Sequence, residues 1–299
     1  YNIFEINTQT NKAVLDVTVE LEKQGFQATY VQPDSDGFTD PKKIENAITS
    51  KTGLISIMHV NNEIGIINDV KSVGEIAEKH DIFFHCDAAQ SFGKIPIDVQ
   101  GMNIHLLSIS AHKIYGPKGI GALYVRKKNP KVEVEPLLYG GGQEMGLRPG
   151  TLATPLIAGL AEASRIAREE MASEGKRLQE LRDYLFNGLI EKCPDIVLNG
   201  SMENRLPNNL NISFLGVQSE TLMNSLRGEV AVSNGSACTS DNWTSSHVLA
   251  GMGIDEERKQ SAIRFSLGRF TTQDEIDHAI DQIAIVVQRL RNASMQASS

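Results

Sequence analysis

Short runs of apolar residues alternate with longer segments of mixed polarity along the first half of the chain. Two of these runs cover Leu54–Val60 and Ile82–Cys86, and a third leads into Ser110. Apolar runs of this length, without strict alternation, are typical of strands buried on both faces of a parallel sheet. The pattern therefore predicts an α/β fold in which helices cover a buried sheet.

Helical periodicity fills the segments between and beyond these strands. It predicts helices over residues 41–48, 70–80, 155–193 and 273–291. Asp40 and Asp69 stand where N-caps are expected, and Pro41 fits the first position of a helix. Residues 292–299 are polar and are predicted to form a disordered tail.

The chain changes character near Gly175, where we expect the long helical region to break. Beyond that point, short strands are predicted over residues 211–214, 230–233 and 263–266. We therefore predict a large domain over residues 1–172 and a smaller C-terminal α/β domain over residues 173–299.

Polar side chains follow each of the three apolar runs at the point where the strand ends. In chain order they are Asn62, Asp87, Gln90, Ser110, His112 and Lys113. The carboxyl ends of parallel strands form the ligand crevice of an open α/β sheet, so these side chains are predicted to share one site. Taken alone, Asp87 could equally be a helix N-cap, and Lys113 could be a surface lysine beside a turn.

Lys113 has the setting of a lysine that carries a carbonyl cofactor. It follows strand-end hydroxyl groups and precedes the glycine-rich segment 116–121. An amine held at a strand end can form a Schiff base with a cofactor aldehyde. A carboxylate such as that of Asp87 can keep the pyridine nitrogen of such a cofactor protonated, which lets the ring accept electrons.

Seven segments together resemble the cysteine desulfurases, which belong to the class V aminotransferase-like enzymes that use pyridoxal 5′-phosphate. They are residues 58–65 (MHVNNEIG), 85–90 (HCDAAQ), 112–121 (HKIYGPKGIG), 139–144 (YGGGQE), 148–151 (RPGT), 235–240 (GSACTS) and 263–268 (IRFSLG). Their order and spacing match the family over nearly the whole chain. The resemblance implies the type I fold of pyridoxal-phosphate-dependent transferases, with a large mixed or parallel-sheet domain and a smaller C-terminal α/β domain.

The resemblance also implies a role for each strand-end residue that would meet the cofactor ring. Lys113 would be the Schiff-base lysine, and Asp87 would be the partner of the pyridinium nitrogen. Gln90 would donate a hydrogen bond to the ring oxygen. Asn62 would lie near that oxygen and near the substrate.

The phosphate of the cofactor is implied to have partners from two subunits. Ser110 and His112 would bind it within one subunit. Thr151 would reach the phosphate of the neighbouring subunit's cofactor, so the resemblance implies a homodimer.

Cys238 lies in the small, polar, glycine-containing segment 233–242. A reactive thiolate needs accessible surroundings of this kind. Cys86, inside an apolar strand, and Cys193, near a helix end, fit inert buried thiols instead. In the family, the cysteine that matches Cys238 takes the sulfur of a cofactor-bound cysteine and becomes a persulfide, with L-alanine as the other product.

A cysteine substrate carries a carboxylate, for which the planar guanidinium group of an arginine is a bidentate partner. Arg264 alternates with Ile263 and Phe265 along a predicted strand, and the resemblance makes it the substrate-binding arginine together with Asn62. Arg269 is a competing candidate, and an exposed strand arginine is the alternative interpretation of Arg264.

Composition agrees with an enzyme of this kind. The 299 residues are 40% hydrophobic, carry a formal net charge of −8 and include three cysteines. The negative charge argues against broad nucleic-acid binding. We see no membrane-spanning run, signal peptide or disulfide framework. These features lead us to expect a cytoplasmic protein without a metal site. The resemblance implies that it is a homodimer that acts on L-cysteine and passes its sulfur to an acceptor protein.

Three departures from the family leave alternatives open. The chain lacks a long N-terminal stretch and the long C-terminal tail of the housekeeping iron–sulfur enzymes, and Asn11 stands where the family has a histidine over the cofactor ring. An amide is neither an aromatic stacking platform nor a base at neutral pH. The sulfur could serve iron–sulfur assembly, DNA phosphorothioation or tRNA thiolation. The alternative hypothesis is a catalytically impaired homologue or fragment that acts through protein–protein contacts.

Overall fold

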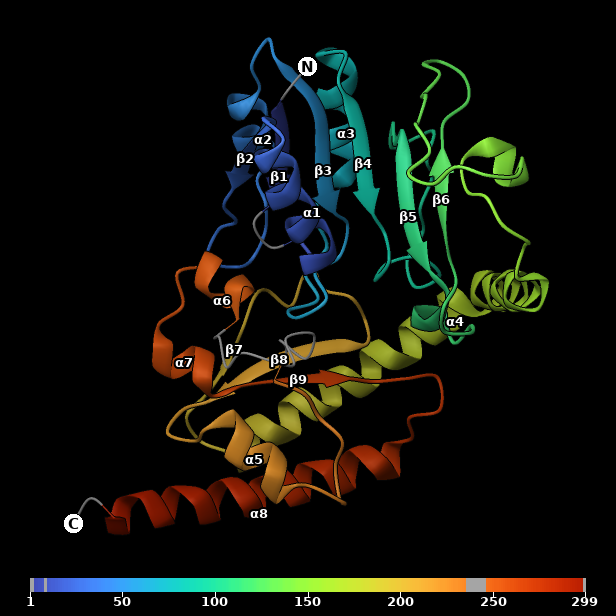
Figure 1. Cartoon of the computed structure of the whole chain (residues 1–299). Coiled ribbons are helices and arrows are strands. Elements are labelled where there is room, and N and C mark those ends of the chain that lie inside the picture. The colour runs from blue at the N-terminus through green and yellow to red at the C-terminus, as the bar shows by residue number, and fades with distance from the viewer. Residues whose placement is uncertain (1–2, 8–9, 235–245, 298–299) are drawn as a thin grey trace.

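The computed structural model describes residues 3–7, 10–234 and 246–297. Two β-sheets dominate it, and one long helix connects them (Figure 1). The first 125 residues build the larger sheet, and residues 196–266 contribute the strands of the smaller one.

The larger sheet has six strands in the order β2-β1-β3-β4-β5-β6. The strands are β1 (Ile3–Asn7), β2 (Gln27–Val31), β3 (Thr52–Met58), β4 (Phe83–Asp87), β5 (Leu106–Ser110) and β6 (Gly121–Val125). The first five are parallel to one another, whereas β6 runs antiparallel to β5. The sheet is therefore mixed, and the α/β fold class predicted from the sequence is confirmed.

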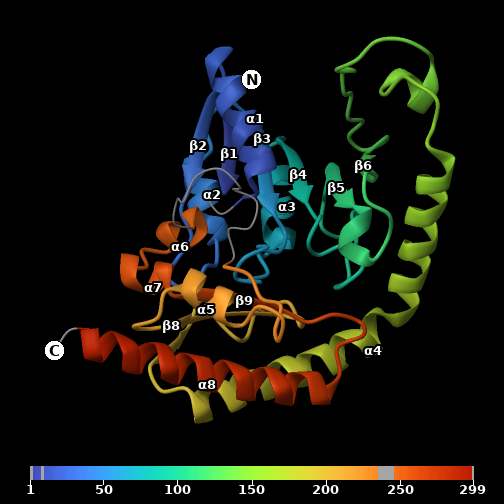
Figure 2. The same ribbon diagram turned by 60° about the horizontal axis from the view of Figure 1, so that its bottom comes forward.

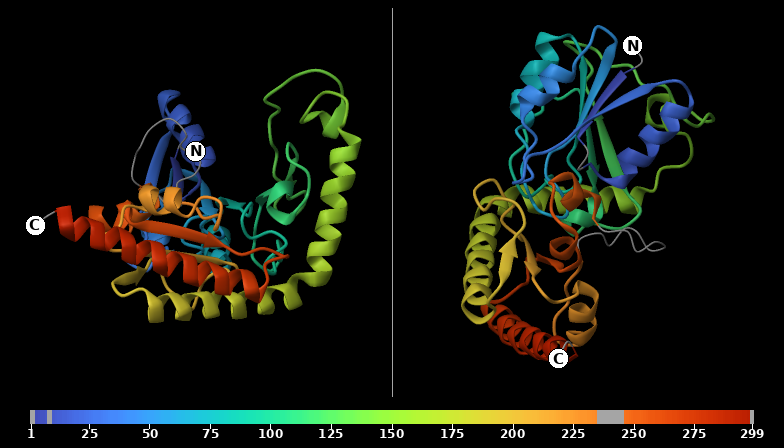
Figure 3. Two further views of the ribbon diagram at one scale, coloured as in Figure 1. Left: turned by 90° about the horizontal axis from the view of Figure 1, so that it is seen from below. Right: turned by 90° about the vertical axis from the view of Figure 1, so that its left-hand side faces the viewer.

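The central strands have one apolar and one polar face. Ile57 of β3, Phe84 of β4 and Leu107 of β5 belong to a buried core together with residues of α2 (Pro41–Ala47) and α3 (Val70–Lys79). Because side chains alternate along a strand, Ser56, His85, Asp87 and Ser108 lie on the opposite face. Figure 3 shows α1 (Lys12–Lys23) on the side of the sheet away from α2 and α3.

Local sequence signals fix where the early helices begin. Asp40 caps α2 by accepting a hydrogen bond from the Lys42 amide, and Asp69 caps α3 by accepting one from the Ser72 amide. Both predicted N-caps are thus confirmed. Each cap satisfies a backbone donor that would otherwise lack a partner at the start of its helix.

The predicted break at Gly175 is wrong. Helix α4 runs without interruption from Thr154 to Lys192, a length of 39 residues. Ala163 and Ala167 pack near the larger sheet, whereas Leu178 and Leu185 enter the core of the smaller one. A single glycine costs a helix about 1 kcal/mol, which packing on both sides of this position outweighs.

The smaller sheet is antiparallel, in the order β7-β8-β9. Its strands are β7 (Ile196–Leu198), β8 (Asn209–Phe214) and β9 (Ala262–Ser266). The C-terminal half of α4 and α8 (Gln273–Ala297) pack with it (Figure 2). Three shorter helices complete this part: α5 (Ser219–Ser225), α6 (His247–Gly251) and α7 (Glu256–Gln260).

Two further predictions for this half need correction. Residues 230–233 do not form a strand, since only Ser233 makes an isolated bridge, which pairs it with Arg264. The last helix continues to Ala297, so most of the predicted tail 292–299 is helical. Within the described ranges, every helix is too short or too polar to cross a bilayer.

Candidate functional site

The carboxyl ends of β3, β4 and β5 lie side by side at the edge of the larger sheet that faces the smaller one (Figure 1). Asn62 follows β3, Asp87 ends β4, and Lys113 follows β5 in the short 3-10 helix η1 (Ala111–Ile114). Three strand ends that are separated in sequence therefore deliver polar side chains to one edge, as the sequence predicted.

Asp87 is buried, with 6% of its surface exposed. Its Oδ1 accepts a hydrogen bond from the Ala89 amide at 2.9 Å. The local turn expected of a capping aspartate is therefore present. Among the described residues, this turn engages Oδ1 alone, so Oδ2 can accept from a further donor on the polar face of the sheet.

His85 was assigned no role by the sequence, yet it lies beside Asp87 on that polar face. Its Nδ1 is 2.8 Å from the hydroxyl of Ser56 on β3, and its Nε2 is 2.9 Å from the hydroxyl of Ser108 on β5. Burial lowers the pKa of His85, and the nearby Asp87 opposes this only in part. A neutral imidazole thus links three strands on the face of the sheet that carries the Asp87 carboxylate. The sequence could have indicated this, because His85 and Asp87 are two positions apart in a predicted strand and therefore lie on the same face.

Lys113 is exposed, and the loop around it is tightly folded. The Oγ of Ser110 lies 2.8 Å from Nδ1 of His112, one residue before the lysine. Tyr115 ends η1 with a φ of 65°, and a Cβ on Gly116 would come within 2.9 Å of the Ala111 oxygen. Glycine at 116 thus permits the sharp exit that leaves the lysine at the strand end.

Partial burial lowers the pKa of His112, and the charges of Lys113 and Lys118 add to the effect. A neutral imidazole next to two ammonium groups can donate to an anion without a large change in charge. Ser110 and His112 are therefore close enough to act on the same ligand.

Gln90 holds an unused hydrogen-bonding group. Its Oε1 is buried without a hydrogen-bond partner among the described residues. Buried polar atoms are nearly always paired, so an orphaned one beside Asp87 marks a place where a ligand completes the site.

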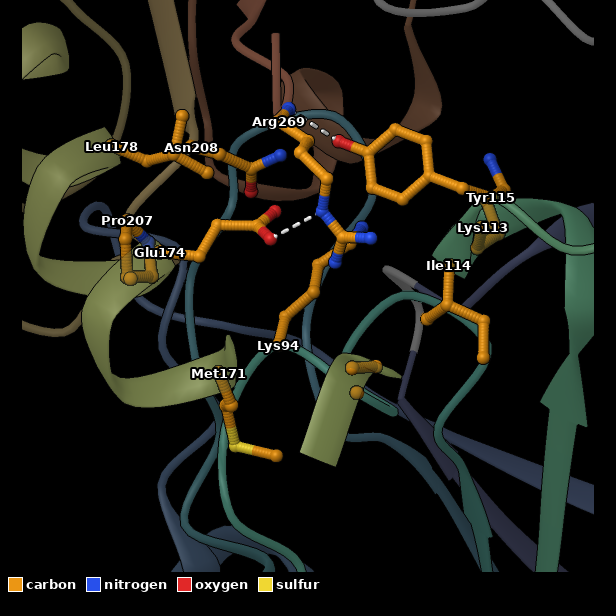
Figure 4. Close-up of a pocket in the computed structure, with 13 residues that line it drawn as sticks. Lys94, Lys113, Ile114, Tyr115, Met171, Glu174, Leu178, Pro207, Asn208 and Arg269 are labelled. Carbon is orange, nitrogen blue, oxygen red and sulfur yellow. Dashed lines mark hydrogen bonds and ion pairs between the residues drawn. The ribbon is translucent and has the colours of Figure 1, made fainter. Parts of the chain in front are cut away.

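Lys113 also lines a cavity of about 30 Å³ between η1, α4 and the connections of the smaller sheet (Figure 4). Lys94 lines the same cavity, and its pKa is lowered to about 8 by burial first and then by the charge of Lys113. Arg269 lies there too, with its Nε 2.7 Å from Glu174 and its guanidinium group 4.9 Å above the ring of Tyr115. Arg269 is thus held by partners of its own.

Arg264 on β9 reaches the strand-end site from the smaller sheet. Its Nη1 donates to the main-chain oxygen of Asn62 at 2.9 Å, and its Nη2 lies 3.4 Å from Oγ of Ser233. The side chain is half-buried. Arg264 and Asn62, which are 202 positions apart, are therefore neighbours at the same edge.

Other candidates lie elsewhere. Thr151 is exposed on the segment that leads into α4. Cys238 lies outside the described residues. Cys86 and Cys193 are buried, and burial raises the pKa of both thiols, as expected of inert cysteines. Asn11 is the N-cap of α1, and its Oδ1 accepts from the Ala13 amide at 3.0 Å.

These residues fit pyridoxal phosphate. A buried carboxylate with a spare oxygen, an amide group that can donate through its NH2 and an accessible lysine lie at one edge, with a hydroxyl–imidazole pair beside them. Each matches one polar group of the cofactor: ring nitrogen, ring oxygen, aldehyde and phosphate. Within the described ranges, no group of three or more His, Cys, Asp or Glu side chains could hold a metal ion.

Comparisons with known proteins agree with this geometry. The aminotransferase class-V family matches residues 6–279. The chain is 52% identical to cysteine desulfurase IscS of Proteus mirabilis over 284 residues, which covers 95% of this chain and 70% of that protein.

Two solved structures are also similar. A NifS-like protein superposes with a TM-score of 0.88 at 36% identity, covering 96% of this chain and 75% of the other. The structure described as SspA in complex with cysteine gives a TM-score of 0.76 at 38% identity, covering 91% and 75% of the two chains.

The chain therefore belongs to the aminotransferase class-V family of pyridoxal-phosphate-dependent enzymes. Within that family it is a member of the cysteine desulfurases, as the resemblance of its motifs predicted.

Proposed function

We propose that this protein removes sulfur from L-cysteine, releases L-alanine and holds the sulfur as a persulfide on Cys238 for an acceptor protein. The observation that carries the proposal is the approach of Arg264 from the smaller sheet to Asn62, at the edge where Asp87 ends β4 and Lys113 follows β5. A site for a small amino acid needs a cation near the cofactor lysine to bind the substrate carboxylate. Arg264 is the candidate for this cation at this edge of the sheet.

The overall reaction balances without a further reagent. Pyridoxal phosphate, when bound, supplies an electron sink for the bonds that break at the substrate. The thiolate of Cys238 attacks the sulfur of the substrate, and the carbon–sulfur bond breaks with its electron pair left on carbon, which takes up a proton. L-Cysteine and the Cys238 thiol thus become L-alanine and a Cys238 persulfide.

The residues of this chain have separate tasks in that reaction. Lys113 attaches the cofactor through its amine and can carry protons to and from the substrate carbon. Asp87 holds the proton on the ring nitrogen, and the Ser56–His85–Ser108 hydrogen bonds support the face on which it lies. The side-chain NH2 of Gln90 donates a hydrogen bond to the ring oxygen.

Ser110 and His112 are proposed to hold the phosphate group. Their 2.8 Å contact brings a hydroxyl and an imidazole together beside Lys113. A hydroxyl and an imidazole N–H both donate readily to phosphate oxygens.

The homodimer is part of the same proposal. The segment between β6 and α4 stands apart from both sheets (Figure 2) and carries exposed apolar side chains, with Leu137 95% and Tyr139 84% exposed. Exposed apolar side chains gathered on one segment favour burial against a partner. Thr151 belongs to this segment, which supports its assignment to the site of a second subunit. Domains over residues 1–172 and 173–299, and a cytoplasmic location, stay predictions.

The acceptor is proposed to be a protein, with iron–sulfur assembly, DNA phosphorothioation and tRNA thiolation as candidate pathways. A persulfide on a cysteine can transfer its outer sulfur to another thiol by exchange. The alternative hypothesis, a catalytically impaired homologue that acts through protein contacts, draws on Asn11, whose side chain is engaged as a helix cap.

The test begins with cofactor attachment. Purified protein is loaded with pyridoxal phosphate, reduced with borohydride and digested, and the label is located by mass spectrometry. We expect it on Lys113, and we expect Lys113→Ala to lose both the label and alanine formation from L-cysteine. Lys118→Ala, which removes an exposed lysine from the same loop, is the matched control. Labelling without alanine formation in the wild-type protein would favour the alternative hypothesis.

A further inference from the structure

The turn between β3 and α3 is the place where the two sheets meet. Asn61 closes this turn, because its Oδ1 accepts from the amides of Glu63 at 2.8 Å and Ile64 at 2.9 Å. The main-chain oxygen of Glu63 then accepts from Nδ2 of Asn211 at 3.1 Å and Nδ2 of Asn209 at 3.3 Å. Two side chains of β8 therefore form hydrogen bonds with the turn that carries Asn62.

Gly65 makes the close approach possible. Its φ is 72°, and a Cβ at this position would overlap the side chain of Asn209. The Gly65 oxygen also accepts from the Leu206 amide at 2.8 Å. Both the backbone conformation and the missing side chain thus serve contact between the two sheets.

The carboxyl group of Glu63 makes a separate contact. Only 3% of this residue is exposed, and its Oε2 accepts from Oγ of Ser246 at 2.5 Å. Burial raises the pKa of Glu63, against the opposing effects of the Ser246 hydrogen bond and of nearby His247 and Arg264. The same Ser246 oxygen accepts from the Leu249 amide at 3.1 Å and so caps α6. Burying a carboxyl group is costly, so this one is expected to have a specific purpose.

Ser246 is the first described residue after Cys238, and Ser233 precedes that cysteine by five positions. Ser233 is held as well: its oxygen accepts from the Arg264 amide at 2.6 Å, and its amide donates to the Arg264 oxygen at 3.3 Å. Arg264 in turn donates to Asn62, the neighbour of Glu63. Both ends of the cysteine-bearing stretch are therefore attached near the same strand end.

We infer that Glu63 is a positioning residue for sulfur transfer, whose carboxyl group fixes Ser246, and with it the C-terminal end of the stretch that carries Cys238, beside Asn62. The inference rests on the proposed function. Five residues of chain span at most about 17 Å, so a thiol attached at Ser233 stays within reach of the Arg264 edge. In general, a chain segment that is fixed at both ends can occupy less space than one fixed at a single end, so a second fixed end raises the effective concentration of a group on that segment.

Four variants separate this role from other effects of Glu63. Glu63→Ala and Ser246→Ala each remove the hydrogen bond from one side, and the double variant removes both partners. Glu63→Gln removes the electrostatic interaction of the carboxylate with Arg264, but it keeps an oxygen that can accept a hydrogen bond from Ser246. Two readouts are taken on the cofactor-loaded protein: the single-turnover rate of persulfide formation from L-cysteine, and the affinity for L-alanine from the cofactor absorbance. L-Alanine occupies the pocket without needing the thiol.

We expect Glu63→Ala and Ser246→Ala to slow persulfide formation roughly 10- to 100-fold, as misplacement of a reacting group does. Their affinity for L-alanine should stay unchanged, the double variant should be no slower than either single one, and Glu63→Gln should retain the wild-type rate. The inference is overturned if Glu63→Ala transfers sulfur at the normal rate. It is equally overturned if affinity for L-alanine falls in proportion to that rate, since Glu63 would then act through the pocket.

A third readout is independent of catalysis. The rate at which an alkylating reagent labels Cys238 is measured in substrate-free protein, with buried Cys86 and Cys193 as internal references. Loss of the anchor should raise this rate in Glu63→Ala and Ser246→Ala but not in Glu63→Gln. If wild-type protein forms no alanine from L-cysteine, the proposed function fails, while this labelling still decides whether Glu63 anchors the stretch.

Discussion

Arg264 and Asn62 join the two halves of the site. The guanidinium group of Arg264, on β9, donates to the main-chain oxygen of Asn62 at 2.9 Å, at the end of β3. This hydrogen bond, together with the contacts of Asn209 and Asn211 with the same turn, holds a cation of the smaller sheet next to the strand ends of the larger one. Any substrate that bridges Arg264 and Lys113 depends on that arrangement.

Substitution of the two competing arginines should distinguish them. Arg264→Lys keeps a charge but loses the planar fork, so we expect the KM for L-cysteine to rise at least about 10-fold, the value of a charged hydrogen bond. Arg269→Lys should change KM much less, because Arg269 is held by Glu174 and Tyr115. Steady-state kinetics on both variants, with thermal midpoints as a control for folding, would reverse our assignment if Arg269→Lys showed the larger KM effect.

Cys238→Ser should separate cofactor chemistry from sulfur transfer. The variant should still bind pyridoxal phosphate and still show the absorbance change on adding L-cysteine, because the thiol is not a cofactor ligand. It should form no persulfide and release no sulfide, since a hydroxyl group is a poor nucleophile toward sulfur. Cys193→Ser is the matched control. Sulfide release by Cys238→Ser at the wild-type rate would show that another group does the work.

Asn11 should affect stability and cofactor retention in opposite directions. Because its side chain caps α1, Asn11→Ala should lower the free energy of unfolding by about 1 kcal/mol, and Asn11→Ser should restore most of it. Asn11→His loses the cap but offers an aromatic ring, which should raise cofactor retention by about 1 kcal/mol. It should also raise turnover roughly 100-fold if the ring relays protons.

Urea unfolding and cofactor dissociation, measured on the same preparations, report the two effects of Asn11 separately. Unchanged retention and turnover in Asn11→His would mean that Asn11 is not equivalent to the family histidine. Lower activity would mean that the asparagine is itself adapted to this site.

Buried histidines should make the fold sensitive to mild acid. Burial lowers the pKa of His59 to about 4, and burial also lowers the pKa of His85. Below about pH 6.5 the unfolded chain takes up protons that the folded one resists, so stability is full above that pH and falls toward pH 4. For His59 alone the loss is roughly 3 kcal/mol.

The measurement is the urea midpoint at several pH values between 7.5 and 4. His59→Leu removes one of the titrating groups and should flatten the profile, whatever its effect on absolute stability. An equally steep profile in that variant would contradict the assignment to His59.

Gly65→Ala should be much more damaging than a change at an open glycine. It combines a positive φ with overlap of the new Cβ and the Asn209 side chain, so we expect a loss above about 2 kcal/mol. Gly25→Ala, with a φ of 95° and no atom near the new Cβ, should cost only the backbone strain of about 1 to 2 kcal/mol. Equal losses in denaturant unfolding would show that contact between the sheets adds nothing at Gly65.

Much of the fold could be predicted because its signals are local. The apolar runs gave the central strands, and Asp40 and Asp69 marked two helix starts, because a cap satisfies donors only one to three residues away. The strand ends followed from one general property of parallel sheets, so Asp87 and Lys113 could be placed at the same edge before the structure was known. The prediction of a helix break at Gly175 was wrong because it rested on a local signal alone. The free-energy penalty of one glycine in a helix is small, and packing of α4 against both sheets outweighs it.

The sequence by itself determined the type of chemistry that this protein can perform, because the residue types and spacings that indicate it occur within short segments at the strand ends. Only the tertiary structure decided which distant groups act together. The Ser56–His85–Ser108 link, the contact of Arg264 with Asn62 and the buried pair of Glu63 with Ser246 join residues up to 202 positions apart. No local pattern encodes such pairs, because they depend on how two sheets pack and on burial, which makes each polar group seek a partner wherever the fold supplies one.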